Sequence, residues 1–434
     1  MTATDTHRVI DAVWRIESPR LIAGLARIVR DVGIAEDLAQ DALVAALEQW
    51  PAAGVPDNPG AWLMAAAKHR AIDHFRRNQR LERKHEELGR EGVVQKIGTR
   101  EVQAGEDQIG ALEAALDDEI GDDLLRLVFT ACHPVLSTEA RVALTLRLLG
   151  GLTTDEIARA FLVPEPTIAQ RIVRAKRTLA EKQVPFEVPR GAELAARLSS
   201  VLEVIYLIFN EGYAATAGDD WMRTTLCDDA LRLGRILADL AAQEPEVHGL
   251  VALMEIQASR SRARVGPAGE PILLFDQNRA HWDHLLIGRG LTALDRAKKL
   301  GGASGPYVLQ AEIAACHARA RTPEETDWAR IVEFYDALAR LVPSPIIELN
   351  RAVAVGMAFG PAAGLELVDA LTDERSLENY HLLPGVRGDL LKKLDRLEEA
   401  RAEFERAASL TRNVRERDLL LDRARECTAA LHRS

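Results

Sequence analysis

Apolar residues recur at the spacing of an α-helix along nearly the whole 434-residue chain, and this pattern limits the fold more than any other feature. The chain is rich in Ala, Leu, Arg and Glu, which are strong helix formers, and only 5% of its residues are aromatic. Two early stripes at this spacing are Ile22, Leu25, Ala26 and Val29, and then Leu38, Ala42, Ala46 and Trp50. The sequence therefore predicts an all-α fold.

The chain is longer than one hydrophobic core usually serves, so we expect several domains. A polar stretch with segregated charges follows residue 80 and lacks helical periodicity. A second interruption, Gln183 to Pro189, contains two prolines that stop a helix. We predict a first helical domain at 1–80, a flexible acidic linker at 81–120, a compact helical domain at 121–184 and a helical extension at 190–434.

Neither a signal peptide nor a membrane span is predicted. The segment from Met1 to Arg8 is polar, and no stretch of about 18 apolar residues occurs. We therefore expect a cytoplasmic protein that does not contact a membrane. The four cysteines, which are far apart and form no Cys-x-x-Cys pair, are expected to be reduced core residues: Cys132, Cys227, Cys316 and Cys427. No metal or cofactor is predicted.

The formal net charge of −11 hides two basic clusters. The first contains Lys68, Arg70, Arg76, Arg77, Arg80, Arg83 and Lys84, and the second contains Arg171, Arg174, Lys176, Arg177 and Lys182. The stretch between them, from Glu101 to Asp123, is acidic and has no Lys or Arg. An acidic chain with two discrete basic helices fits a protein that contacts DNA at two separate places.

The second cluster lies in a helix-turn-helix pattern. Thr153 and Glu156 form a capping box that starts a short helix, Leu162 to Pro166 form a turn, and a second helix is expected to begin at Thr167. Its inward stripe is Ile168, Ile172, Ala175 and Leu179, which leaves Gln170, Arg171, Arg174 and Arg177 outward. Such a face suits a helix in the DNA major groove. A solvated helix of a bundle would show the same spacing.

This segment resembles region 4 of the extracytoplasmic-function (ECF) sigma factors of bacterial RNA polymerase, in which a helix-turn-helix binds the minus-thirty-five promoter element. The matching residues are Thr167, Ile168, Gln170, Arg171, Arg174, Ala175 and Lys176. Ala169 and Pro164 depart from the family pattern, which affects the expected base preference. The predicted minus-thirty-five contacts are Thr167, Gln170, Arg171, Arg174, Lys176 and Arg177.

The N-terminal block resembles region 2 of the same group. Its sequence AEDLAQD, from Ala35 to Asp41, is similar to the helix that docks on the largest subunit of core RNA polymerase. Asp37, Gln40 and Asp41 lie opposite the apolar stripe and are the predicted polymerase contacts. A solvated helix face would look the same.

The following helix resembles the family's helix that recognises and melts the minus-ten element, over Pro59, Ala61, Trp62, Leu63, Ala67, Ala71, Ile72, Asp73, Arg76 and Arg77. We expect a loop from Pro51 to Pro59 to hold an unstacked base. The predicted minus-ten contacts are Trp62, His69, Arg70, Asp73, Arg76, Arg77 and Arg80. His69 departs from the family's common Asn, and Trp62 stands beside apolar residues, which favours packing in the core.

The acidic linker gains a possible role from the resemblance, because the family's connector threads the interior of the polymerase. Its carboxylates would then mimic nucleic acid against basic walls, or the segment is only a soluble tether. They are Glu101, Glu106, Asp107, Glu113, Asp117, Asp118 and Glu119.

The rest of the chain resembles an ECF subgroup with a long extension of tetratricopeptide-like repeats. The similar segments are FTACHP (129–134), YLIFNEGY (206–213), DQNRAHWD (276–283), TDWARI (326–331) and PSPIIELNRAVAV (343–355). A helix-turn-helix repeat unit is expected at Leu390, Leu394, Leu397, Ala400, Phe404, Ala407 and Ala408, with Asp395 at the usual glycine position. The resemblance implies that the extension regulates or supports activity and binds a small regulatory protein.

Polar residues in this extension have two interpretations. They line a ligand or peptide groove, or they form a satisfied network that fixes helix packing, which is the interpretation we favour. They are Asn210, Glu211, Asp276, Arg279, Trp282, Asp283, Asp327, Asn350 and Arg351.

Two rival functions compete with this interpretation. A helix-turn-helix activator with a sensor domain would not need the segments around Asp37 and Trp62. An enzyme could pair Glu211 with Asp276 and Asp283 or use Cys132 and His133, but no nucleophile elbow, phosphate loop or metal-spaced His pair accompanies them. The predicted function is a non-enzymatic sigma factor that binds core RNA polymerase, recognises both promoter elements and starts transcription.

Overall fold

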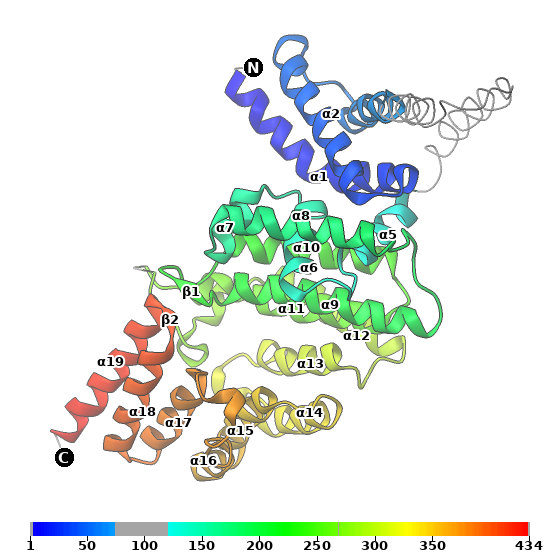
Figure 1. Cartoon of the computed structure of the whole chain (residues 1–434). Helices are drawn as coiled ribbons and strands as arrows, with labels where there is room; N and C mark the ends of the chain where they lie inside the picture. Colours follow the sequence, from blue (N-terminus) through cyan, green and yellow to red (C-terminus); the bar gives the residue numbers. More distant parts are fainter. Residues whose placement is uncertain (1–2, 74–119, 268, 433–434) are drawn as a thin grey trace, which may run out of the picture. The chain divides into compact units, whose positions relative to one another are not determined.

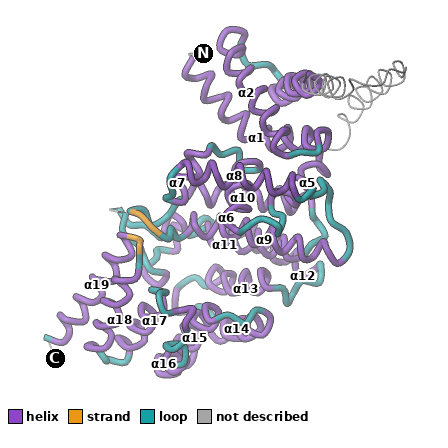
Figure 2. Tube along the Cα trace, viewed as in Figure 1, coloured by secondary structure: helices purple, strands orange, loops and turns teal. Residues whose placement is uncertain are grey.

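The computed structural model describes residues 3–73, 120–267 and 269–432, and these are almost entirely helical (Figure 2). Within these ranges the only named strands are two short ones, β1 (Ala217–Gly218) and β2 (Arg412–Asn413). The predicted all-α fold is confirmed. Three predicted minus-ten contacts, Arg76, Arg77 and Arg80, and the acidic linker through Glu119 lie outside the described residues.

The chain divides into two compact units, Met1–Val204 and Ile205–Ser434. Helix α9 (Ala192–Tyr213) begins in the first unit and ends in the second (Figure 1). The first unit therefore contains the segments that were assigned to DNA and polymerase contacts, and the second contains most of the extension.

The first unit begins with α1 (Ala3–Val29) and α2 (Val32–Ala53), which pack together. The residues of both predicted apolar stripes are buried, apart from the half-buried Val29, and Leu25 and Trp50 are fully buried. The loop after α2 is shorter than predicted, because Pro51 lies inside the last turn of the helix and the loop starts only at Gly54, whose φ is 87°. A further helix begins at residue 59 and is described to residue 73.

The helix-turn-helix follows α5 (Ile120–Ala131) and α6 (Thr138–Leu148), and consists of α7 (Thr154–Phe161) and α8 (Glu165–Glu181). Both halves of the predicted capping box are present, because Thr153 Oγ1 accepts from Glu156 N and Glu156 accepts from Thr153 N. Helix α8 starts at Glu165 and not at Thr167, because Pro166 lies in the first turn, where its missing N–H has no helical partner to lose.

Successive helices pack on one another through the second unit. After α9 they are α10 (Thr224–Leu240), α11 (Pro245–Ala258), α12 (His284–Lys299), α13 (Pro306–Arg319), α14 (Trp328–Leu341), α15 (Pro345–Phe359), α16 (Pro361–Asp369), α17 (Leu382–Lys393), α18 (Leu397–Leu410) and α19 (Val414–Leu431). Four of them begin at a proline, as expected for a residue that suits the first helical position. Their apolar side chains form several local cores along the chain.

The predicted repeat unit corresponds to the hairpin of α17 and α18. Phe404 is fully buried there, and a Cβ on Gly388 would approach its ring to 2.8 Å, so the two helices need a glycine at this crossing. Asp395 adopts a φ of 61°, the left-handed conformation that glycine usually supplies in such a turn. The hairpin has the expected form, and its assignment to the tetratricopeptide repeats stays a prediction.

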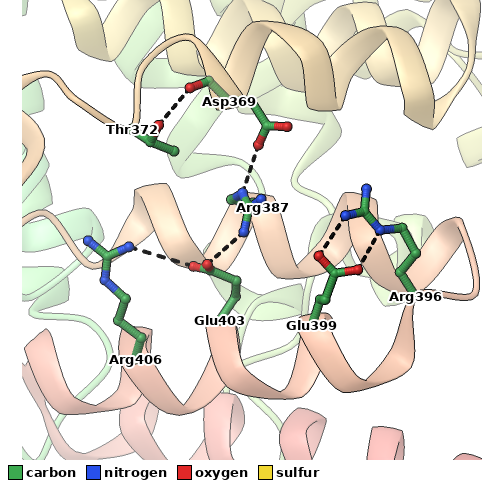
Figure 3. Close-up of polar contacts among 7 residues, drawn as sticks. All are labelled: Asp369, Thr372, Arg387, Arg396, Glu399, Glu403 and Arg406. Atoms are coloured by element: carbon green, nitrogen blue, oxygen red, sulfur yellow. Dashed lines mark hydrogen bonds and ion pairs between the residues drawn. The ribbon is translucent and has the colours of Figure 1, made fainter.

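Ion pairs join the helices of this region (Figure 3). Arg387 of α17 donates from Nε to Asp369 Oδ1 of α16 at 2.7 Å and from Nη1 to Glu403 Oε1 of α18 at 2.8 Å. Arg406 adds a longer contact to the other Glu403 oxygen, at 3.9 Å. One guanidinium therefore holds three successive helices together.

The two ends of the second unit are joined. Strand β1, just after α9, pairs in parallel with β2, just before α19. Asn413 is fully buried and its side-chain amide donates to the backbone oxygens of Ala215 and Asp220, at 3.0 and 2.8 Å.

Four of the nine singled-out polar residues of the extension cap helices or form ion pairs that hold the fold in place. Glu211 accepts from Thr216 and Arg223, Asp283 and Asp327 cap the N-termini of α12 and α14, and Arg351 pairs with Asp336 and Glu348. This agrees with the structural interpretation that the sequence favoured.

All four cysteines are buried and free of disulfides, as expected. Burial raises the pKa of the Cys227 thiol to about 12 and that of Cys132 to about 11. None of the helices in the described part of the chain is long and apolar enough to span a membrane.

Candidate nucleic-acid interface

Helix α8 has one buried and one exposed face. Its predicted inward stripe is confirmed, since Ile168, Ile172, Ala175 and Leu179 are all buried. Gln170, Arg174 and Arg177 are exposed on the outer face, and Arg171 and Thr167 are half-buried. The structure thus gathers five of the six predicted minus-thirty-five contacts along the exposed side of one helix.

The charges of this outer face are largely uncompensated. Arg177 forms an exposed pair with Glu181 at 3.3 Å. Within the described residues, no carboxylate lies at ion-pair distance from Arg171 or Arg174; the nearby Glu139 acts on Arg171 only through space. A carboxyl-poor basic face is what phosphate binding requires.

Val173 belongs to the same face and was missed by the sequence reasoning. Its side chain is 64% exposed, between Gln170 one turn before it and Arg177 one turn after it. The apolar side chain of an exposed valine is unfavourably hydrated. Contact with a thymine methyl group in the major groove would remove it from water. Its position off the inward stripe was the available signal.

Lys176 lies elsewhere. Its Nζ is 2.5 Å from Glu36 Oε2, and Arg147 Nε is 2.6 Å from the other Glu36 oxygen. Glu36 is 2% exposed, so both cations are directed to a buried carboxylate of α2. Position 176 follows Ile172 by one turn and borders the buried stripe, which explains why its side chain does not join the outer face.

The predicted polymerase-docking face of α2 combines acidic and apolar side chains. Asp37 and Asp41 are exposed, with side chains 77% and 62% accessible. Val44, 49% exposed, and Leu47, 37% exposed, follow at helical spacing on this side. Gln40 is half-buried and its amide donates to Glu36 Oε1 at 2.5 Å.

The described part of the minus-ten helix, residues 59–73, contains four of the seven predicted minus-ten contacts: Trp62, His69, Arg70 and Asp73. His69 and Asp73 are exposed, and Arg70 lies 3.8 Å from Asp41. Trp62 is half-buried and meets Trp50 edge to face, with ring centroids 5.3 Å apart, so it packs against α2 as its apolar neighbours suggested.

Two family models match the segments that contain these faces. The sigma-70 region 2 model matches residues 14–81, which include α2 and the minus-ten helix. The sigma-70 region 4 model matches residues 126–179, which include the helix-turn-helix. The chain belongs to the ECF sigma factors of the sigma-70 family.

Relatives of this sigma factor fall into two kinds. An uncharacterized protein of Rhizobium meliloti is 42% identical over 94% of this chain and 93% of its own length. A probable ECF RNA polymerase sigma factor, SigI of Mycobacterium tuberculosis, is 24% identical over 42% of this chain and 58% of its own. SigK of Mycobacterium bovis, also an ECF sigma factor, is 29% identical over 37% of this chain and 78% of its own.

The extension separates this sigma factor from the shorter relatives. Residues 197–298 match a family of unknown function, DUF6596. The search of solved structures finds no match. As a sigma factor, the protein acts in promoter recognition and transcription initiation, with core RNA polymerase and promoter DNA as partners.

Proposed function

We propose that this sigma factor docks on core RNA polymerase through the exposed face of α2, recognises the minus-ten element with the helix that begins at residue 59, and recognises the minus-thirty-five element with α8. It needs no catalytic group of its own, because promoter melting requires only binding energy that favours the separated strands. The protein acts in the cytoplasm, and its extension regulates or supports transcription.

The outer face of α8 carries this proposal. Arg171 and Arg174 lack carboxylate partners among the described residues, while the buried stripe anchors the helix to α6 and α7. A rigid helix with unpaired guanidinium groups can bind phosphates and donate to guanine edges without first breaking an ion pair.

Gln170, Val173 and Arg174 are proposed to select bases. Glutamine pairs well with adenine and arginine with guanine, and Val173 has the size and polarity to contact a thymine methyl group. Lys176 is proposed to join the interface only if its pair with Glu36 opens, because its Nζ is otherwise held at 2.5 Å from that carboxylate.

Acidic and apolar groups together support docking through α2. Asp37 and Asp41 can meet basic residues of the polymerase, while Val44 and Leu47 supply area that gains by leaving water. Two exposed aliphatic side chains one turn apart gain free energy only if a partner buries them, which a helix face that stays in water does not provide.

Run-off transcription with core polymerase on genomic fragments tests the proposal. We expect promoter-specific transcripts from the unmodified chain, fewer from Arg174→Ala, and unchanged amounts from Arg159→Ala, an exposed arginine of α7 that pairs with Asp155. A chain that binds core polymerase and yields no specific transcript on any fragment would refute the proposed function.

The role of the extension needs a cut that leaves the first unit whole. Arg197 donates to the Phe129 oxygen at 2.9 Å, and Ser200 donates to the Cys132 oxygen at 2.7 Å, so α9 residues before 204 brace the helices that carry α8. We therefore propose to compare the full chain with one that ends at Val204, after checking that its helicity survives. Equal polymerase affinity and equal transcription would exclude a role for the extension.

Regulation by a small protein partner is proposed for the same extension. Pull-down from a lysate of the source organism, with the chain ending at Val204 as the control bait, is the direct measurement. A partner that binds both baits equally would place its contact outside the extension.

A further inference from the structure

The extension contains a second set of arginines without carboxylate partners. They lie in and around the irregular segment between α11 and α12, in contact with aromatic rings from several elements. This arginine–aromatic cluster consists of Arg260, Arg264, Arg279, Tyr213, Trp221 and Trp282.

The guanidinium groups and rings alternate. Arg264 Cζ lies 3.6 Å from the Tyr213 ring centroid, and Arg260 Cζ lies 5.8 Å from both the Tyr213 and the Trp282 centroids. Arg279 Cζ is 4.7 Å from the Trp282 centroid. Three cations are thus held close together, and the negative faces of the rings offset only part of their charge.

Within the described residues, the arginines of the cluster have no acid at ion-pair distance, and Glu324 and Glu325 act on Arg279 only through space. Most arginines of α17 to α19, in contrast, have an acid at that distance. Burial, followed by the charges of Arg260 and Arg279, lowers the pKa of the neighbouring His317 to about 3. A protonated histidine is therefore strongly disfavoured at this place.

The hydrogen bonds of the cluster hold its guanidinium groups in place but do not neutralise their charge. Arg279 donates from Nη1 to the His317 and Ala320 oxygens at the end of α13, each at 2.6 Å, and Arg264 donates to the Tyr213 oxygen at the end of α9. These are neutral acceptors. The Trp282 indole N–H, in a side chain that is only 4% exposed, has no hydrogen-bond partner among the described residues.

Arg260 is the member that can reach a ligand. It is partly exposed, and its hydrogen bonds to Tyr213 Oη and to the Gln257 side chain both use Nη2. Its Nε–H and its Nη1 hydrogens have no hydrogen-bond partner among the described residues, and each can donate to an oxygen of a carboxylate or phosphate. The buried Arg264 would act on such an anion through its charge alone.

We infer that the arginine–aromatic cluster is a binding site for a small oxyanion, a phosphate or carboxylate group, with Arg260 as its direct contact and Arg279 and Arg264 as the surrounding positive charge. The aromatic rings hold the guanidinium groups in place, so little side-chain freedom is lost on binding. This site lies in the extension, outside the segments that match the sigma-70 models.

Isothermal titration of the full chain with sodium phosphate tests the inference, with sodium succinate as the carboxylate probe and sodium chloride at equal ionic strength as the blank. We expect saturable binding of at least one of the two probes, weakened about tenfold or more in Arg260→Gln. The matched control is Arg262→Gln, two residues away, exposed and without a ring contact among those described; it should bind as the unmodified chain does.

The relative response to phosphate and succinate identifies which group the site prefers. Arg260→Lys keeps the charge and loses the Nε–H and Nη1 donors, so it should also bind more weakly. It serves in case Arg260→Gln loses helicity. Binding that is equal in Arg260→Gln, Arg260→Lys and Arg262→Gln, or no heat beyond the chloride blank with either probe, would overturn the site.

Discussion

The arginines of α8 and those of the α17–α18 hairpin are the same residue type in helical surroundings, yet the groups around them differ. Arg171 and Arg174 have no acid at ion-pair distance among the described residues, whereas Arg387, Arg396 and Arg406 each contact one. Charge left unpaired is available to a partner, and charge paired between helices holds the fold. The position of the carboxylates, more than that of the arginines, therefore decides which arginines can bind a partner and which stabilise the fold.

The strongest challenge to this contrast is Arg387→Ala. The change leaves Glu403, whose side chain is 13% exposed, without its closest cation and removes the ion pair between α16 and α17. We expect the free energy of unfolding to fall by about 2 to 3 kcal/mol in urea titration. Arg396→Ala, which removes an exposed pair with Glu399, is the control and should cause no comparable loss.

A titration tests the unpaired arginines of the extension. The pKa of His317 is lowered to about 3 from an ordinary 6.5, so acid favours the unfolded chain, which binds that proton more readily. Between pH 7.5 and pH 5 the unmodified chain should lose about 2 kcal/mol more stability than His317→Gln does. Parallel urea curves for the two chains at both pH values would show that His317 is not held neutral.

The α8 side of the contrast is tested by Arg174→Ala. Promoter affinity of the holoenzyme should fall about tenfold, or about 1.4 kcal/mol, while the stability of the chain stays the same. The slope of log affinity against log salt should become shallower by about one, as expected for one lost phosphate contact. A drop in stability equal to that of Arg387→Ala would mean that Arg174 belongs to the scaffold.

The smallest effect is expected for Val173→Ala. If Val173 contacts a thymine methyl group, deoxyuridine in the minus-thirty-five element should weaken binding by the unmodified chain by about 0.8 kcal/mol, the value of one buried methyl-sized group. The Val173→Ala chain should show a smaller difference between the two bases. An identical difference in both chains would assign the methyl contact to another residue.

Much of the fold was accessible from sequence because the information is local. The capping box at Thr153 and Glu156, the buried stripe of α8 and the prolines that begin helices depend on residues three or four positions apart. The two misplaced boundaries, at Pro51 and at Glu165, concern prolines inside an end turn, where proline is tolerated although its usual helix-breaking role predicts a position outside the helix.

The site was less accessible, because pairing between distant residues decides it. Nothing near Lys176 in sequence indicates that Glu36 would hold it, at a separation of 140 residues, and nothing near Arg387 indicates its bond to Glu403. The arginine–aromatic cluster likewise joins Tyr213 to Arg264 and Trp282 across three elements. Such contacts follow from the tertiary fold and not from helical periodicity.

The pairing of β1 with β2, held by the buried Asn413, has a consequence for how the extension unfolds. In an open solenoid each repeat touches only its neighbours, so the terminal helices can fray one after another. Here the last hairpin is also bonded to the loop that follows α9, so loss of α19 exposes the beginning of the array as well as its end. We expect the extension to unfold in a single cooperative thermal transition, because its first and last helices lose their contacts together.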